Sequence, residues 1–246
     1  FRYIIRLHLF RGKPDIRIDY TFVNDNAAKT MSQVASLTCG WKLAGTDPAF
    51  YHLEGPRTDP TRLFQVDDRR FRVNNQPAGR TASGWAATWN RQGGIAVGVR
   101  HFWQNWPKSL SVGQRGLSVG ILPGFAKGTY DGRPIRDEAK LFYYLRNGEY
   151  SFKIGVAKTH EMWATFFTGK PTPETLDDHF RSRQQRLLAQ ATPERIAATA
   201  VLGEMPPARP GPTAAYDEWF SGFLDKHMHG QEEVREYGLL NFGDWY

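Results

Sequence analysis

Apolar and polar residues alternate with a period of two through most of the chain from Phe1 to about Phe167. An extended strand places alternate residues on opposite faces, so such a segment has one dry face and one wet face. Clusters of Gly, Pro, Asn and Asp separate these segments, which is the pattern of a mainly β protein. The sequence therefore predicts an antiparallel β-sandwich. The clearest strand is Asp15–Val23, in which Ile16, Ile18, Tyr20 and Phe22 alternate with Arg17, Asp19 and Thr21.

The same alternation predicts further strands at residues 3–9, 33–41, 69–73, 85–89, 95–102, 117–122, 140–146, 150–157 and 161–167. Between two of them, Asn147 and Gly148 form the pair that tolerates positive φ at both central positions of a type I′ turn, which predicts a hairpin. Residues 45–68 carry Pro48, Pro56 and Pro60, and we interpret them as a loop that crosses an edge of the sandwich.

The pattern becomes helical after about residue 170. Thr172 and Pro173 form a helix start, with Thr as the N-cap and Pro at the first helical position, and Thr192 and Pro193 repeat it. We expect two successive helices, the second ending at Gly203.

Four parts follow from these patterns. Residues 1–170 form the sandwich, residues 171–204 the trailing helices, residues 205–213 a Pro-rich linker, and residues 214–246 the beginning of a helical domain. The chain opens without Met and in the middle of an alternating strand, so we expect it to be a fragment of a longer protein. The helical domain is predicted from the spacing of Tyr216, Trp219, Phe220, Phe223 and Leu224.

Composition narrows the class of protein. The hydrophobic fraction of 40% and the charged fraction of 23% are ordinary for a globular protein of 246 residues, but 14% aromatic residues with eight Trp is high and indicates a binding surface. The net charge of +7 favours anionic partners. The chain has no run of Lys and Arg and no nucleic-acid motif, which argues against nucleic acid as the partner. No stretch approaches the roughly 20 apolar residues that cross a bilayer, so no membrane partner is predicted.

No metal site and no cofactor is predicted. The single cysteine, Cys39, excludes an internal disulfide framework and a zinc cluster built on cysteines. His227 and His229 are two residues apart on an expected helix and so point to different faces.

The most versatile group of side chains lies between Val99 and Leu110. Pro107 and the polar run before it favour a strand that ends near Phe102, with residues 103–108 as a loop at the rim of the sheet. A buried Arg–His pair with two packing Trp would produce the same residues, so a purely structural role stays open. On a rim loop, the aromatic side chains would stack on sugar rings, and the polar ones would bind hydroxyls or carboxylates. The residues concerned are Trp103, Gln104, Asn105, Trp106 and Lys108.

Three segments resemble a known family. Residues 99–108, 155–161 and 237–246 are similar to the exo-rhamnogalacturonan lyase group, which is polysaccharide lyase family 26 with related ulvan-lyase-like proteins. The resemblance covers most of the chain and implies an N-terminal barrel, a central supersandwich of the galactose-mutarotase type and a C-terminal (α/α) toroid. This chain would supply the sandwich and the opening of the toroid. The resemblance also implies a secreted or periplasmic enzyme whose partner is an acidic polysaccharide or oligosaccharide.

The implied reaction is β-elimination on a uronate- and rhamnose-containing glycan. A base removes the proton beside the uronic carboxylate, a second group neutralises that carboxylate, and an acid protonates the leaving oxygen. His101 suits the base because an imidazole titrates near neutrality, and Arg100 offers a planar fork for the carboxylate. Neighbours 100 and 101 point to opposite faces of a regular strand, so both serve one site only if the strand ends or bulges there.

The C-terminal segment completes the implied site. In the toroid-like proteins the cleft lies between toroid and sandwich, and the resemblance implies Tyr246 as the acid, Asn241 as the carboxylate neutraliser, and Asp244 and Trp245 as substrate-binding residues. A helix start capped by Asp244 is the structural alternative. We expect residues 100–108 to face residues 241–246.

Two other classes of function remain. The sandwich is a non-catalytic carbohydrate-binding or scaffold module if all chemistry belongs to the toroid. A glycoside hydrolase needs two carboxyl groups at a defined separation, and the stretch from Val99 to Leu110 contains none, which ranks hydrolysis below elimination. The carboxyl groups available elsewhere are Asp217, Glu218, Glu236 and Asp244.

Overall fold

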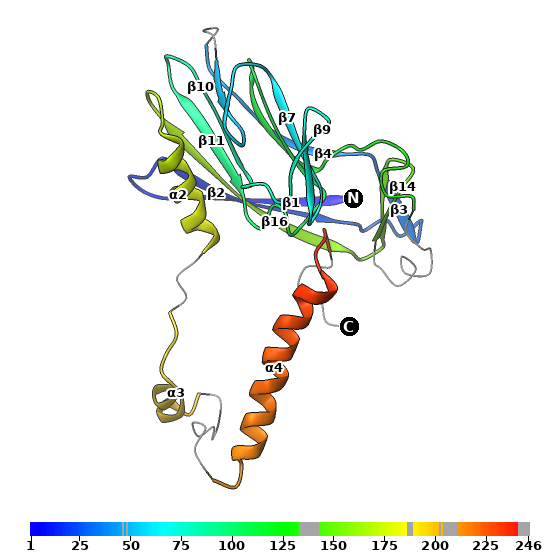
Figure 1. Cartoon of the computed structure of the whole chain (residues 1–246), viewed down its shortest axis with the longest axis vertical. Coiled ribbons are helices and arrows are strands. Elements are labelled where there is room, and N and C mark those ends of the chain that lie inside the picture. Colours follow the sequence, from blue (N-terminus) through cyan, green and yellow to red (C-terminus); the bar gives the residue numbers. More distant parts are fainter. Residues whose placement is uncertain are drawn as a thin grey trace. The chain divides into compact units, whose positions relative to one another are not determined.

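The structure is a computed structural model that describes residues 1–45, 47, 49–132, 143–185, 189–201, 203 and 211–240. The described residues form a mainly β protein with three antiparallel sheets and three helices (Figure 1). The predicted fold class, an antiparallel β-sandwich followed by a few helices, is confirmed.

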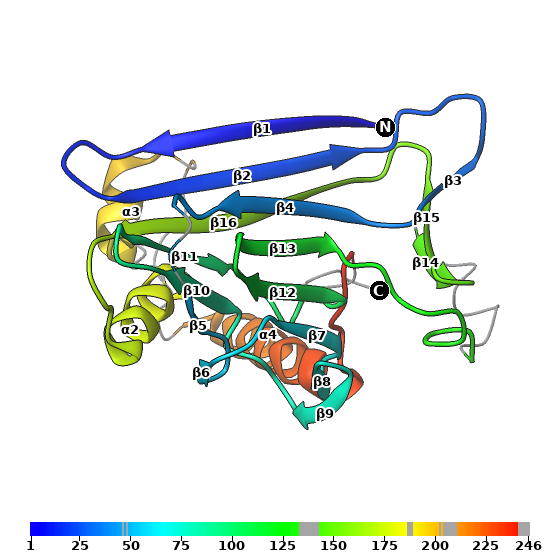
Figure 2. The same cartoon turned by 90° about the horizontal axis from the view of Figure 1, so that it is seen from above.

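The larger of the two facing sheets carries the candidate site. Figure 2 shows β1, β2 and β16 running side by side in it. The alternation in β2 has the predicted effect, because Ile18 and Phe22 are buried in the core while Arg17 and Asp19 lie on the outer face. The sheet has seven strands in the order β1 (Arg2–Leu9), β2 (Asp15–Val23), β16 (Ala157–Phe167), β11 (Gly94–Val99), β10 (Trp85–Trp89), β5 (Phe50–His52) and β6 (Pro56–Arg57).

A second sheet faces the first, and a small sheet lies beside them. In the small sheet Asn147 and Gly148 have φ values of 55° and 83°, which confirms the predicted hairpin. Its strands are β14 (Tyr143–Arg146), β15 (Glu149–Lys153) and β3 (Met31–Val34). The second sheet has the order β4 (Leu37–Lys42), β13 (Gly116–Leu122), β12 (Lys108–Gly113), β7 (Thr61–Asp67), β8 (Arg70–Val73) and β9 (Gln76–Gly79).

Hydrophobic residues pack on both sides of the large sheet. Its inner face shares the main core with the second sheet. On its outer face lies helix α2 (Pro173–Gln184), which begins at the predicted Pro173. Phe180 of α2 stacks on Trp85 with ring centroids 5.7 Å apart, and Arg183 of α2 bonds to Asp15 at 2.9 Å. Helix α2 is therefore part of the sandwich rather than a trailing element.

The chain divides into two compact units. One comprises residues 1–184 together with 237–246, and the other comprises residues 185–236. The second unit contains α3 (Pro193–Thr199) and α4 (Ala214–Val234). The side chain of Thr192 accepts a hydrogen bond from the backbone N–H of Arg195 at 3.3 Å, as expected of an N-cap, but α3 ends at Thr199, before the predicted Gly203. Most of the predicted linker, residues 205–210, lies outside the described residues. In the part of the chain that is described, no helix has the length and apolar character needed to cross a membrane.

Two predicted elements are wrong. Residues 45–68 are not a single loop, because they contain β5, β6 and β7, and β7 lies inside the second sheet between β12 and β8. Residues 33–41 are not one strand, because the chain leaves β3 of the small sheet at Val34 and enters β4 of the second sheet at Leu37.

Candidate functional site

Residues 100–107, here called the rim loop, connect β11 to β12. Strand β11 ends at Val99, three residues earlier than predicted, and His101 has a φ of 52°. The carbonyl of His101 accepts hydrogen bonds from the backbone N–H and the side-chain amide of Asn105, each at 3.0 Å. This closed turn ends regular strand geometry just before Arg100 and His101, which is the condition under which both residues serve one site.

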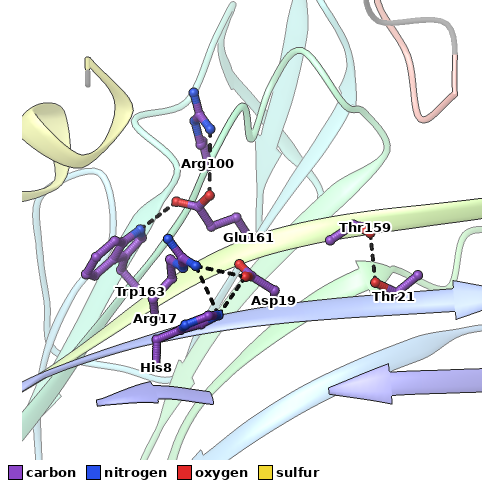
Figure 3. A network of polar contacts seen from close by, with 8 residues as sticks. All are labelled: His8, Arg17, Asp19, Thr21, Arg100, Thr159, Glu161 and Trp163. Carbon is purple, nitrogen blue, oxygen red and sulfur yellow. Dashed lines mark hydrogen bonds and ion pairs between the residues drawn. The ribbon is translucent and has the colours of Figure 1, made fainter. Parts of the chain in front are cut away.

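Arg100 lies beside a carboxylate of the neighbouring strand. Its backbone N–H donates to the carbonyl of Glu161 at 2.9 Å, and its guanidinium lies 3.6 Å from the Glu161 carboxylate (Figure 3). The second oxygen of that carboxylate accepts a hydrogen bond from Trp163 Nε1 at 2.7 Å. The Arg100 side chain is 28% exposed, so a solvent-borne anion can reach it.

His101 is half-buried at the junction of the rim loop with α2. Its backbone N–H donates to Oε1 of Gln184, the last residue of α2, at 3.2 Å. The positive φ of His101 is unusual for a residue with a side chain and fixes where its imidazole leaves the backbone.

The segment Tyr237–Leu240 packs against the rim loop. The rings of Trp103 and Tyr237 meet edge to face with centroids 4.9 Å apart, and the backbone N–H of Gly238 donates to the carbonyl of Gln104 at 2.8 Å. Leu239 is fully buried. The residues that follow, Asn241, Asp244, Trp245 and Tyr246, lie outside the described residues, so their convergence on the rim loop stays a prediction.

Three residues expected on an open loop are buried. Trp106 is 4% exposed and stacks on Tyr130 with ring centroids 5.9 Å apart, and Asn105 is 6% exposed. Lys108 is 1% exposed and is the first residue of β12 rather than part of the loop. The predicted stacking of Trp106 on sugars and the predicted binding of substrate by Asn105 and Lys108 are therefore corrected, because solvent does not reach these groups.

The ammonium of Lys108 ties the rim loop to the second sheet. It donates to the carbonyls of Asn105, Pro107 and Ile121 at 2.8, 3.2 and 3.0 Å. Burial, with a smaller contribution from Lys158, lowers the pKa of Lys108 well below its usual range. All three partners are acceptors, which matches the three N–H donors of the ammonium form.

His160 is also buried, at 5% exposure, and stacks near Phe22. Burial, then Lys108 and Lys158, lowers the pKa of His160 well below its usual range. Its Nε2 has no hydrogen-bond partner among the described residues. A neutral imidazole enclosed in the core is a packing group.

A charged cluster on the outer face of the large sheet was not predicted from the sequence. His8 of β1 and Arg17 of β2 are paired in register, and Asp19 follows on the same face of β2. His8 Nε2 lies 2.9 Å from Asp19 Oδ2, and Arg17 lies 3.0 Å from His8 Nε2 and 3.3 Å from Asp19 Oδ2. The Arg17 and His8 side chains are 27% and 36% exposed.

The role of Nε2 in these contacts depends on the tautomer of His8. Nε2 cannot donate to Asp19 and accept from Arg17 at the same time. If Nε2 carries the proton, it donates to Asp19 while Arg17 pairs with the same carboxylate, and Nδ1 keeps its lone pair.

Together these residues form one polar face of the large sheet. Figure 3 shows Arg100 and Glu161 next to Trp163 and Arg17, with Asp19 and His8 beyond them and the bonded hydroxyls of Thr21 and Thr159 further along the strands. The polar face, defined as these eight residues, contains two guanidinium groups and an imidazole, together with the carboxylates of Asp19 and Glu161 that contact them. The wet side of β2 was visible in the sequence, but its register against β1 and β16 was not.

Within the described part of the chain, no group of three or more His, Cys, Asp or Glu residues is arranged to hold a metal ion. No protein-family model matches the sequence, and no curated protein matches it. The functional proposal therefore depends on the geometry of the site and on the three segments that carry the resemblance.

Proposed function

We propose that this chain is the β-sandwich portion of a polysaccharide lyase that cleaves an acidic, uronate- and rhamnose-containing glycan by β-elimination. The supporting observation is the packing of Tyr237–Leu240 on Trp103 and Gln104. This contact holds the chain next to the rim loop directly before Asn241. On this proposal the enzyme is secreted or periplasmic, where it meets its polymer.

The proposed roles follow from chemistry and position. Arg100 neutralises the uronic carboxylate, and His101 takes the proton from the carbon beside it; a positioned base accelerates such a step on the order of 100- to 10,000-fold. The carbon–oxygen bond then breaks, a carbon–carbon double bond forms, and Tyr246 protonates the leaving oxygen. Asn241 shares the neutralising role with Arg100. Arg17 and His8 on the polar face hold the carboxylates or hydroxyls of adjoining sugar units.

Substitution of His101 tests the assignment of the base. His101→Asn keeps the positive φ, because Asn tolerates the left-handed region, but removes the base. In the full-length protein, His101→Asn is expected to lower kcat by roughly 100-fold or more. The rate is measured from the ultraviolet absorbance of the unsaturated product. The exposed His229→Ala variant on α4 serves as the matched control. Turnover of His101→Asn equal to that of His229→Ala would remove His101 from the mechanism.

A second candidate, a non-catalytic glycan-binding sandwich, is favoured by the burial of Trp106, Asn105 and Lys108. The rim loop then serves mainly to anchor the C-terminal segment, and the polar face supplies affinity alone. The same assay separates the two functions, because a binding module affects KM and leaves kcat unchanged when Arg17 or Arg100 is replaced by Gln.

A further inference from the structure

A groove of ≈ 550 Å³ lies at the opposite edge of the large sheet from β1. It is bordered by β5, β6, the end of β10 and the residues that lead into α2. Its size falls within the range of sites for small ligands, roughly 300–1,000 Å³. The side chains used in the argument are Phe50, His52, Arg57, Asp59, Trp89 and Lys170.

One wall of the groove is an aromatic platform. Phe50 and Trp89 are paired in register on β5 and β10, and their rings stack with centroids 6.0 Å apart and an interplanar angle of 24°. Phe50 is 57% exposed, so its ring is open to solvent. Rings held in this way present a flat face to the C–H face of a sugar.

The imidazole of His52 extends this wall in a fixed orientation. It lies parallel to the indole of Trp85, with centroids 4.6 Å apart and an interplanar angle of 2°, and the Trp85 Nε1 donates to Asp177 of α2 at 3.1 Å. Burial is the main cause that lowers the pKa of His52. The neutral ring has one donor and one acceptor, which suits sugar hydroxyls.

The rim of the groove is charged. Arg57 is held in place by hydrogen bonds from its guanidinium to the carbonyls of Leu53 at 2.9 Å and Glu54 at 3.4 Å. Lys170 is exposed and precedes the first residue of α2, Pro173. The carboxylate of Asp59 accepts a hydrogen bond from Thr58 at 3.1 Å. Among the residues that line the groove, Arg57 and Lys170 are cations and Asp59 is a carboxylate, while the carboxylates of Glu54, Glu174 and Asp177 also act on His52.

We propose that the groove is an accessory subsite that binds one unit of an acidic saccharide, with the sugar ring on Phe50 and Trp89 and its carboxylate on Lys170. The choice of a uronate as the ligand rests on the proposed function. The subsite is distinct from the polar face, because α2 lies between them: Phe180 contacts Trp85 on one side, and Arg183 lies over Trp163 on the other, 4.5 Å from the ring centroid.

Calorimetric titration of the full-length protein with digalacturonate tests this subsite. The wild-type protein is expected to bind saturably, and Phe50→Ala and Lys170→Ala are each expected to weaken binding roughly tenfold, about 1.4 kcal/mol. Tyr3→Ala and Lys29→Ala are matched controls, since they remove an exposed aromatic ring of β1 and an exposed lysine away from the groove, and both are expected to bind as the wild type does.

Two results would overturn the subsite: no saturable binding by the wild-type protein, or unchanged binding by both groove variants. The methyl ester of digalacturonate tests the carboxylate contact, and equal affinity for the ester and the acid would reject an acidic ligand. The proposed function fails separately. If binding depends on Phe50 and Lys170 but no unsaturated product forms, the lyase is rejected and the subsite is kept. If both variants bind as the wild type does and catalyse elimination at its rate at low substrate concentration, the subsite is rejected and the lyase is kept.

Discussion

At the scale of single residues, the interior of the sandwich contains two titratable groups, Lys108 and His160, of which the sequence predicted Lys108 on an open loop. Lys108 begins β12 and gives its three donors to three backbone carbonyls, so it works as an internal tie between the rim loop and β13. His160 lies in the same core, and the charge of Lys108 is one of the causes that lower its pKa. Solvent access, rather than residue type, decides which polar side chains serve a site.

The lowered pKa of His160 predicts a loss of stability in acid. In the unfolded chain an imidazole titrates near pH ~6.5. Below that pH the unfolded chain binds a proton that buried His160 in the folded chain does not, so the free energy of unfolding falls as the pH drops through this value. Above it, both states are neutral at this residue and the contribution vanishes. His160→Leu is expected to unfold with less dependence on pH on the acid side, measured by urea denaturation above and below pH ~6.5.

Phe22→Leu is the non-titrating control for this prediction, because Phe22 packs beside His160. It is expected to lower stability at every pH while keeping the acid-side slope of the wild type. His52 and His179, whose pKa values are also lowered by burial, contribute equally to all three proteins. If His160→Leu and the wild type lose stability in parallel as the pH falls, the account of His160 is incorrect.

At the scale of elements, the contact of α2 with the large sheet depends on a glycine. A Cβ atom at Gly98 of β11 would lie 2.3 Å from Cδ1 of Phe180 and 2.9 Å from its Cγ. Phe180 is 3% exposed and stacked on Trp85, so it has little room to move. The absence of a side chain at Gly98 therefore lets α2 lie directly on the sheet, between the groove and the polar face.

Gly98→Ala is expected to destabilise the protein by roughly 1–3 kcal/mol, the usual cost of overpacking a filled site. Urea denaturation of the variant measures this change in the free energy of unfolding. Gly40→Ala on β4 is the matched control, because a Cβ there meets its nearest atoms at 3.9 Å. Equal stability of the two variants would show that α2 is not held against Gly98.

The sequence predicts strands that have one apolar and one polar face, and it misses strands in which both faces are buried. Strand β2 has the predicted bounds because its apolar and polar residues alternate. Strand β7 was mistaken for loop because Leu63, Phe64, Gln65 and Val66 are all buried and so do not alternate. Gln65 fits there only because its amide bonds to backbone groups of Asp67, Arg80 and Ala82, which no local pattern reveals.

In the candidate site, too, features that depend on local geometry could be inferred from the sequence, and features that depend on contacts between distant residues could not. The sequence made a break in the strand the condition for Arg100 and His101 to serve one site, and the strand ends at Val99, just before them. The burial of Trp106 and Lys108 depends on β13 and Tyr130, which are distant in sequence. The pairing of His8 with Arg17 and Asp19 depends on the register of β1 against β2.

At the scale of the whole molecule, the outer face of the large sheet carries both proposed binding regions, and the sandwich unit closes on itself through the C-terminal segment. The chain leaves this unit after Gln184 and rejoins it at Tyr237, beside the rim loop. A lyase needs a base, a carboxylate neutraliser and an acid in one cleft. This return places Tyr237 and Gly238 against Trp103 and Gln104 of the rim loop, which also carries the proposed base.

The nature of the reaction product tests the central claim most directly. The full-length protein, incubated with a uronate- and rhamnose-containing polysaccharide, is expected to release oligosaccharides that end in an unsaturated uronate, detected by ultraviolet absorbance and by a mass one water lower than that of a hydrolysis product. Elimination breaks the glycosidic bond without adding water, which explains both signatures. Saturated oligosaccharides would instead identify a hydrolase, and an unchanged polymer would contradict catalysis by this protein on such a glycan.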